Sequence, residues 1–206
     1  MPFVTFEGVE GSGKTTQLAL AAEALGAAGR DVLVTREPGG TAIGEQIRAI
    51  LLDVGHGHLD PVSEWLLYEA DRRQHVEETL RPAVARGRFV LCDRYGDATE
   101  AYQQVGRGVE ARLVREVDAL ARGGLVPDLT LVYDLPVEEG LGRARVRDLH
   151  VGRFEGAALD FHRRVREAYL AIARREPARV AVIPAGGAPE AVFRETWRLL
   201  AQRFAL

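Results

Sequence analysis

Eight residues near the start of the chain have the types and the spacing of a loop that binds phosphate groups. Gly8-Val9-Glu10-Gly11-Ser12-Gly13-Lys14-Thr15 fits the pattern G-x-x-x-x-G-K-[ST]. Lys14 is the only lysine in 206 residues, and every other member of the Lys and Arg total of 27 is an arginine. A compact ammonium can reach between phosphates where a planar guanidinium cannot, so we expect this loop to bind a nucleotide.

The residues around the loop place it between a strand and a helix. Residues 2–6 read as a short buried strand and residues 16–25 as a helix. In that setting backbone N–H groups and the positive end of the helix surround a phosphate, and the Thr15 hydroxyl reaches a ligand position for Mg²⁺. The alternative is a glycine-rich turn that fits the pattern by chance, and the strand and helix favour the nucleotide. The predicted phosphate contacts are Gly8, Val9, Glu10, Gly11, Ser12, Gly13, Lys14, Thr15 and Thr16.

Asp93 and Arg94 follow residues 88–92, which read as another strand and end in four apolar residues. An acidic group at a strand end beside a phosphate loop is placed to hold Mg²⁺, directly or through water, so Thr15 and Asp93 are the predicted metal residues. A helix N-cap is the alternative role for Asp93. Arg94 is a candidate for a bidentate grip on a phosphate, and a surface salt bridge is its alternative.

An arginine cluster falls in the segment of about residues 143–157. Arg143, Arg145, Arg147 and Arg153 could fold over the phosphates as a lid, because phosphoryl transfer is catalysed by positioning and by positive charge over the transferring group. On an isolated helix the same run would be a solvated face. We expect catalysis to depend on Lys14, Asp93, Arg94, Arg143, Arg147 and Arg153.

The elements that must position these groups alternate along the chain. Strands are predicted at 2–6, 31–35, 88–92, 129–133 and 180–183; helices at 16–25, 61–86, about 97–122, most of 136–176, and after the last strand. This order predicts an α/β fold, a five-stranded parallel sheet flanked by helices, in a single domain covering residues 1–206. Ligands bind such sheets at the carboxyl ends of the strands, where Arg36 to Gly40 and Gly186-Gly187 would join the phosphate loop.

Composition excludes several classes of protein. A net charge of -3 and a pI near 6.0 give no support for nucleic-acid binding, and no apolar run is long enough to span a membrane. The chain begins directly with a strand rather than a secretory signal, which predicts a cytoplasmic protein. Cys92 is the only cysteine, so an internal disulfide is impossible. His75, His150 and His162 have no partner that the sequence identifies.

The chain resembles the bacterial thymidylate kinases over nearly its whole length. The matching motifs, in the family's order, are residues 6–16 (FEGVEGSGKTT), 36–41 (REPGGT), 70–72 (ADR), 93–95 (DRY) and 101–103 (AYQ). The resemblance implies the P-loop nucleoside monophosphate kinase fold with an arginine-rich lid. It also implies transfer of the γ-phosphoryl group of ATP to dTMP, giving dTDP on the route to dTTP, with Mg²⁺. The family is typically a homodimer packed through helices.

The resemblance also implies a dTMP site. Carried over position by position, the set is Glu10, Glu37, Pro38, Arg48, Tyr68, Arg72, Arg94, Thr99, Tyr102 and Gln103. Arg94 would hold the dTMP phosphate, with Arg48 near that phosphate or Glu37, and Glu10 would face the acceptor sugar or phosphate. Arg72 would donate to a thymine carbonyl, Tyr68 would stack on the ring, and Thr99 with Gln103 would line the base site. Tyr102 would crowd the sugar 2′ position and so favour deoxyribose.

Some positions depart from the family pattern. Tyr68 replaces the usual phenylalanine, Ala98-Thr99 a pair of serines, and Gly152 a common aspartate of the lid.

One alternative to a thymidylate kinase is a nucleoside monophosphate kinase for another base, which an acceptor panel would distinguish. A second is a nucleotide-dependent switch, because Asp93-Arg94-Tyr95-Gly96 fits D-x-x-G. A GTPase would also need an N-K-x-D motif, and the chain has no asparagine and no second lysine.

Overall fold

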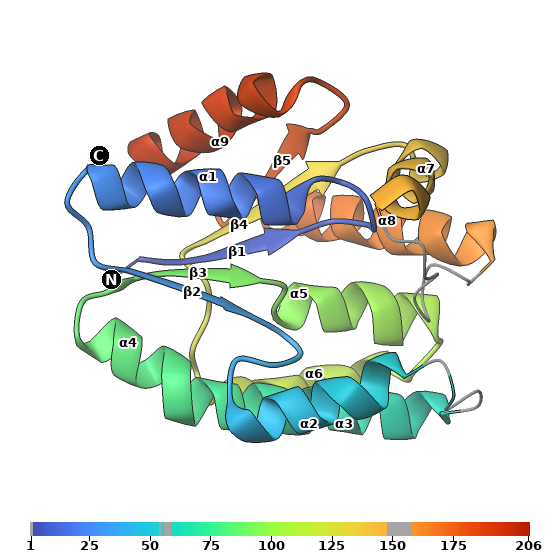
Figure 1. The fold of residues 1–206 in the computed structure, drawn as a ribbon. Helices are drawn as coiled ribbons and strands as arrows, with labels where there is room; N and C mark the ends of the chain where they lie inside the picture. The colour runs from blue at the N-terminus through green and yellow to red at the C-terminus, as the bar shows by residue number, and fades with distance from the viewer. Residues whose placement is uncertain (1, 54, 56–58, 148–157) are drawn as a thin grey trace.

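The computed structural model describes residues 2–53, 55, 59–147 and 158–206. Its five strands are β1 (Phe3–Glu7), β2 (Val32–Arg36), β3 (Phe89–Asp93), β4 (Leu129–Asp134) and β5 (Val180–Pro184). They form one parallel sheet in the order β2-β3-β1-β4-β5 (Figure 1). The predicted strands are confirmed, and most of them begin and end about one residue later than the sequence pattern indicates.

The described helices alternate with these strands. In chain order they are α1 (Lys14–Ala27), α2 (Ala42–Leu52), α3 (Pro61–His75), the π-helical η1 (Val76–Leu80), α4 (Arg81–Ala85), α5 (Gly96–Thr99), the π-helical η2 (Glu100–Gly106), α6 (Ala111–Arg122), α7 (Val137–Arg147), α8 (Leu159–Arg175) and α9 (Pro189–Phe204). The Asp60 side chain caps α3 by accepting from two backbone N–H groups, and the Thr41 side chain caps α2 by accepting from the backbone N–H of Gly44. The predicted α/β architecture is therefore confirmed.

Helices cover both faces of the sheet. On one face α1 and α9 lie together in Figure 1, and Leu18 and Leu200 pack against Phe6 in a buried core. On the other face η1 and α4 pack against β3, while α8 and η2 enclose a second apolar cluster beside β4. Every residue of β1 is buried, and its neighbours β3 and β4 are nearly so, which is the pattern of strands covered on both sides.

The prediction of one helix over about residues 97–122 is wrong in one respect. The helical chain ends at Gly106 and a new helix begins at Ala111. Gly108 has φ of 77°, in the left-handed region that a helix cannot contain, so the backbone turns there. This turn allows η2 to contact α8 and α6 to lie against α3.

Candidate active site

The loop between β1 and α1 is shaped by glycine. Gly11 has φ of 70°, and a Cβ atom there would collide with the carbonyl oxygen of Gly140, so α7 packs directly against the loop. Lys14 is buried, and its Nζ donates to the carbonyl oxygen of Val9 at 3.0 Å. Burial, and after it the positive charge of Arg94, lowers the pKa of Lys14 to about 8. The ammonium is thus held inside the loop, at the position that the motif assigns to phosphate.

Thr15 and Asp93 meet at the edge of this loop. The Thr15 hydroxyl donates to Oδ2 of Asp93 at 3.2 Å, which joins the first turn of α1 to the last residue of β3. A hydroxyl and a carboxylate next to a phosphate loop are the oxygen ligands that Mg²⁺ prefers. The two predicted metal residues are therefore adjacent in space, 78 positions apart in the chain.

A cavity of about 330 Å³ opens beside the phosphate loop, on the side of α9. Its lining residues are Gly11, Ser12, Gly13, Thr16, Gln17, Arg143, Ala185, Gly187, Pro189 and Val192. Arg143 donates to the carbonyl oxygens of Ala185 and Gly186 at 3.1 and 3.3 Å and to Glu139 at 2.6 Å. These contacts fix its side chain in the wall of the cavity. Arg147 is the last residue of α7, and Arg153 lies outside the described residues.

Arg94 lies on the other side of the loop, immediately after β3. It has φ of 70°, which is unusual for a residue with a side chain. Its Nη1 donates to the Tyr169 hydroxyl at 3.2 Å, and its Nη2 donates to the Tyr102 hydroxyl at 3.1 Å and to Glu10 Oε1 at 3.3 Å. The guanidinium also lies over the Tyr102 ring, 4.7 Å from its centre. The residue that follows β3 and a residue of the phosphate loop are thus in direct contact.

The carboxylate of Glu10 stays ionised in this cluster. Burial alone would raise its pKa, but the contact with His162 and the charges of Arg94 and Lys14 outweigh that effect and lower the pKa to about 2. The Tyr102 hydroxyl donates to the same carboxylate at 2.7 Å. Glu10 therefore bridges the loop and the strand end with a permanent negative charge.

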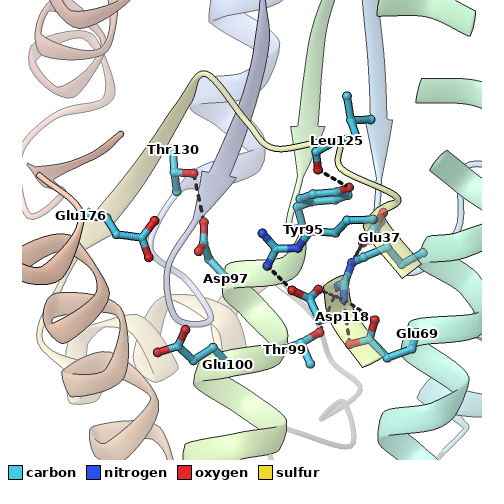
Figure 2. A network of polar contacts seen from close by, with 12 residues as sticks. Glu37, Glu69, Tyr95, Asp97, Thr99, Glu100, Asp118, Leu125, Thr130 and Glu176 are labelled. Atoms are coloured by element: carbon cyan, nitrogen blue, oxygen red, sulfur yellow. Dashed lines mark hydrogen bonds and ion pairs between the residues drawn. The ribbon is translucent and has the colours of Figure 1, made fainter. Parts of the chain in front are cut away.

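A second cluster surrounds the buried guanidinium of Arg72, on α3. The groups that accept its N–H donors are Glu37, Glu69, Asp118 and Thr99, at distances from 2.9 to 3.1 Å. Figure 2 shows these four labelled side chains gathered at one place. Burial acts to lower the pKa of Arg72, but the carboxylates around it raise the pKa well above its ordinary value. The arginine remains charged, with three carboxylates around it.

Glu37 is held from two sides. Its Oε2 accepts from Arg72, and its Oε1 lies 2.9 Å from Nδ1 of His75. Nε2 of His75 contacts the Thr35 hydroxyl at 2.7 Å. The segment after β2 is thus tied to α3, although the sequence identified no partner for His75.

The remaining predicted acceptor residues lie around these two clusters. Arg48 on α2 is half-buried and donates to the carbonyl oxygen of Pro38 at 2.8 Å. Gln103 is buried and donates to Glu64 at 3.0 Å. Tyr68 is half-buried on α3, one turn before Arg72.

Comparison with known proteins identifies the family. The family model described as thymidylate kinase matches residues 6–196. The chain belongs to the thymidylate kinase family. It is 50% identical over 200 residues to the thymidylate kinase of Syntrophotalea carbinolica, covering 95% of this chain and 93% of the relative. It is 51% identical over 201 residues to that of Solidesulfovibrio magneticus, covering 95% and 96%.

A solved structure agrees with this assignment. The crystal structure of thymidylate kinase from Ehrlichia chaffeensis superposes with a TM-score of 0.79 and 34% identity, and covers 97% of each chain. The resemblance drawn from the motifs and the P-loop kinase fold are therefore confirmed. The chain is an ATP-dependent nucleoside monophosphate kinase, and the reaction of its family transfers the γ-phosphoryl group of ATP to dTMP, giving dTDP and ADP.

Sequence reasoning missed several groups of the kinase that contact the predicted site. They are Glu7, Glu69, His75, Asp118, His162 and Tyr169. Apart from Glu7, which lies in the motif of residues 6–16, their only sequence signal is polarity at buried or half-buried positions. His162 and Tyr169, for example, share the apolar face of α8 with Val165. Because their partners lie on distant elements, this signal alone does not say what they contact.

Proposed function

We propose that this chain binds ATP on the loop of residues 8–16 and dTMP against Arg94 and Arg72. The observation that carries the proposal is the contact between Arg94 and Glu10. It brings the arginine expected to hold the acceptor phosphate against the loop expected to hold the donor phosphates. Two phosphates bound in this way would be adjacent, and phosphoryl transfer is catalysed chiefly by such positioning together with electrostatic stabilisation.

In the proposed acceptor site, each residue has a role that suits its chemistry. Arg94 binds the dTMP phosphate, and Arg48 supports the segment of Glu37 and Pro38 beside it. Glu10 faces the acceptor, and Tyr102 limits the space at the sugar 2′ position.

The base lies between Tyr68 and the Arg72 cluster. Tyr68 stacks on the ring, and Thr99 and Gln103 form the wall of the base site. Among the contacts of the described residues, Nη2 of Arg72 uses one N–H on Thr99, which leaves its second N–H for a thymine carbonyl.

Mg²⁺ fits the pair of Thr15 and Asp93. Their oxygens already lie 3.2 Å apart beside the phosphate loop, and they are of the type that this hard cation binds. When bound, the ion would offset the negative charge of the phosphates. Thr15 and Asp93 would hold it, while Lys14 supplies a second positive charge from inside the loop.

The lid arginines divide into two groups. Arg143 lies in the wall of the cavity beside the loop, which supports a role on the nucleoside side of ATP. We retain Arg147 and Arg153 as the proposed cations for the transferring phosphoryl group, because both follow Gly140, the residue of α7 that contacts the phosphate loop, in the sequence.

A homodimer is part of the proposal. Exposed apolar side chains gather on three neighbouring helices: Ile43 and Ile50 on α2, Val62 and Leu66 on α3, and Leu113 and Leu120 on α6. Figure 1 shows these helices along one side of the molecule. Leu120 is 74% exposed, so a second copy covering this face would remove a large apolar surface from water. Sedimentation experiments should give the mass of a dimer for the wild type and of a monomer for Leu120→Lys. A monomeric wild type would refute the proposed homodimer.

We also propose a cytoplasmic location, where ATP is supplied. The buried thiol of Cys92 is free, as is usual in a reducing compartment. Among the described residues, no helix combines the length and the apolar character that crossing a membrane requires.

An acceptor panel tests the proposed function. ADP formation from ATP and Mg²⁺ is measured with dTMP, dUMP, UMP, dCMP, AMP or GMP as the sole acceptor. The proposal predicts a strong preference for dTMP. Activity with another acceptor alone would refute the base site, and hydrolysis of ATP without any acceptor would favour the nucleotide switch.

A further inference from the structure

Helix α8 presents two polar aromatic side chains to the Arg94 cluster. His162 and Tyr169 are seven residues apart, which is two helical turns, so they lie on the same face. Both are buried, with 0% and 1% of their surface exposed. Neither residue is among the predicted phosphate or acceptor contacts. Tyr169 nevertheless contacts Arg94, and His162 contacts Glu10, which in turn contacts Arg94.

Tyr169 contacts Arg94 directly. Its hydroxyl accepts from Nη1 of Arg94 at 3.2 Å and donates to Oε2 of Glu7 at 2.7 Å. A hydroxyl has a single proton, so these two contacts fix a chain of donors from Arg94 through Tyr169 to Glu7. Glu7 is itself anchored, because its Oε1 accepts from the backbone N–H of Tyr95 at 2.7 Å. The hydroxyl therefore connects Arg94 to the rigid centre of the sheet.

His162 reaches the other end of the guanidinium through Glu10. Its Nδ1 lies 3.2 Å from Oε2 of Glu10, a short contact that is off the line of a well-formed hydrogen bond. The other carboxylate oxygen, Oε1, accepts from Nη2 of Arg94. Because a carboxylate is planar, holding one oxygen sets the direction of the other. One helix thus acts on both terminal nitrogens of Arg94.

We propose that Tyr169 and His162 are positioning residues that hold the Arg94 guanidinium at the acceptor phosphate, Tyr169 directly and His162 through Glu10. The inference rests on the proposed role of Arg94 in binding dTMP. The main chain of Arg94 is in a conformation that side chains rarely adopt, with φ of 70°, so its position depends on surrounding contacts. Without these contacts the Arg94 guanidinium would still be charged, but it would no longer be held in position at the acceptor phosphate.

Tyr169→Phe tests the direct contact. The variant keeps the ring, which packs among Val132 and Val165, and removes only the hydroxyl. Loss of one hydrogen bond to a charged group should raise the KM for dTMP about tenfold. The KM for ATP should stay unchanged, because the hydroxyl contacts no group of the predicted ATP set.

Tyr133→Phe is the matched control. Tyr133 is another fully buried tyrosine, and its hydroxyl contacts Thr196 at 3.0 Å, away from Arg94. Tyr133→Phe loses one buried hydrogen bond and Tyr169→Phe loses two, so both should lower the melting temperature, but only Tyr169→Phe should change the KM for dTMP. An equal rise of the KM for dTMP in both variants would show that losing any buried tyrosine hydroxyl weakens dTMP binding, and it would overturn the inference.

His162 is tested by two substitutions. His162→Leu removes the donor near Glu10 and should raise the KM for dTMP, while His162→Asn keeps an N–H at the position of Nδ1 and should restore it. An unchanged KM in the leucine variant, or no rescue by asparagine, would overturn the role of His162.

Arg94→Lys distinguishes a failure of the proposed acceptor site from a failure of the positioning role of α8. If this change leaves the KM for dTMP unchanged, the proposed acceptor site fails, and the inference with it. If Arg94→Lys raises the KM and Tyr169→Phe does not, the acceptor site stands and the positioning role of α8 is refuted.

Discussion

The Arg72 cluster offers a prediction whose size follows from the structure. We consider Arg72→Met, which keeps an apolar stem of similar length but removes the charge. The side chain of Arg72 is 2% exposed, and its ion pairs with Glu37, Glu69 and Asp118 are 2.9 to 3.1 Å long. The substitution leaves these carboxylates together without the cation that they share. Removing one partner of a buried ion pair costs about 3–5 kcal/mol.

Other contacts limit this loss. Glu37 keeps His75, Asp118 keeps Arg122, and Glu69 keeps the Trp65 indole N–H at 3.2 Å. We therefore expect Arg72→Met to lower the free energy of unfolding by about 3 kcal/mol, near the lower end of that range. That is a large fraction of the stability of an ordinary domain, so the change should be easy to measure.

The pH dependence of this loss has a definite sign. Without Arg72, whose positive charge lowers it, the pKa of Glu69 rises in the folded state, so the folded variant binds more protons than its unfolded chain. The deficit should then be larger at pH 8 than at pH 5.5, because the Glu69 carboxylate can be neutralised at the lower pH. Burial already raises the pKa of Glu69, in the same direction.

Urea unfolding followed by circular dichroism at both pH values measures the effect. Arg163→Met is the control, since Arg163 pairs with Glu138 and Asp160 on the exposed surface and its loss should leave the midpoint unchanged. A deficit below about 1 kcal/mol at both pH values, or one that grows on acidification, would show that Arg72 does not stabilise the fold by neutralising these carboxylates.

Three further predictions concern the loop, the sugar and Glu7. Lys14→Ala should lower the rate of ADP formation by orders of magnitude at an unchanged melting temperature, and near-normal turnover would remove its role. Tyr102→Ala should lower the ratio of kcat/KM for dTMP to kcat/KM for its ribose analogue. An unchanged ratio would exclude the proposed role of Tyr102 at the sugar 2′ position. Burial raises the pKa of Glu7 from 4.5 to about 8, so the unfolded chain loses its proton first and stability falls as pH rises from about 4.5 to about 8. Glu7→Gln should abolish that fall in urea titrations, and an identical pH profile would contradict the shift.

The sequence predicted the sheet because the buried strands are apolar and separated by turns. Leu129 and the four residues after it illustrate this, since they form β4 where the pattern placed a strand. The break near Gly108 was missed, although Gly106 and Gly108 could have indicated it. A helical pattern continues across a short turn, so periodicity alone did not show the end of the helix.

The predicted binding motifs lie where parallel strands end, which is why the loop, Asp93 and Arg94 could be placed together from the sequence. The groups that support them could not. Glu37, which contacts His75, lies 38 positions from it in the chain, and Glu7, which contacts Tyr169, lies 162 positions from it. Such pairs are set by how helices pack against the sheet, and a single sequence contains no local pattern for them.

A crystal structure of the protein with dTMP would test the acceptor site most directly. We expect the phosphate within hydrogen-bond distance of the Arg94 guanidinium, beside Glu10, with the thymine stacked on Tyr68 and one carbonyl directed at Arg72. A phosphate bound away from Arg94, or a base turned away from Arg72, would contradict it.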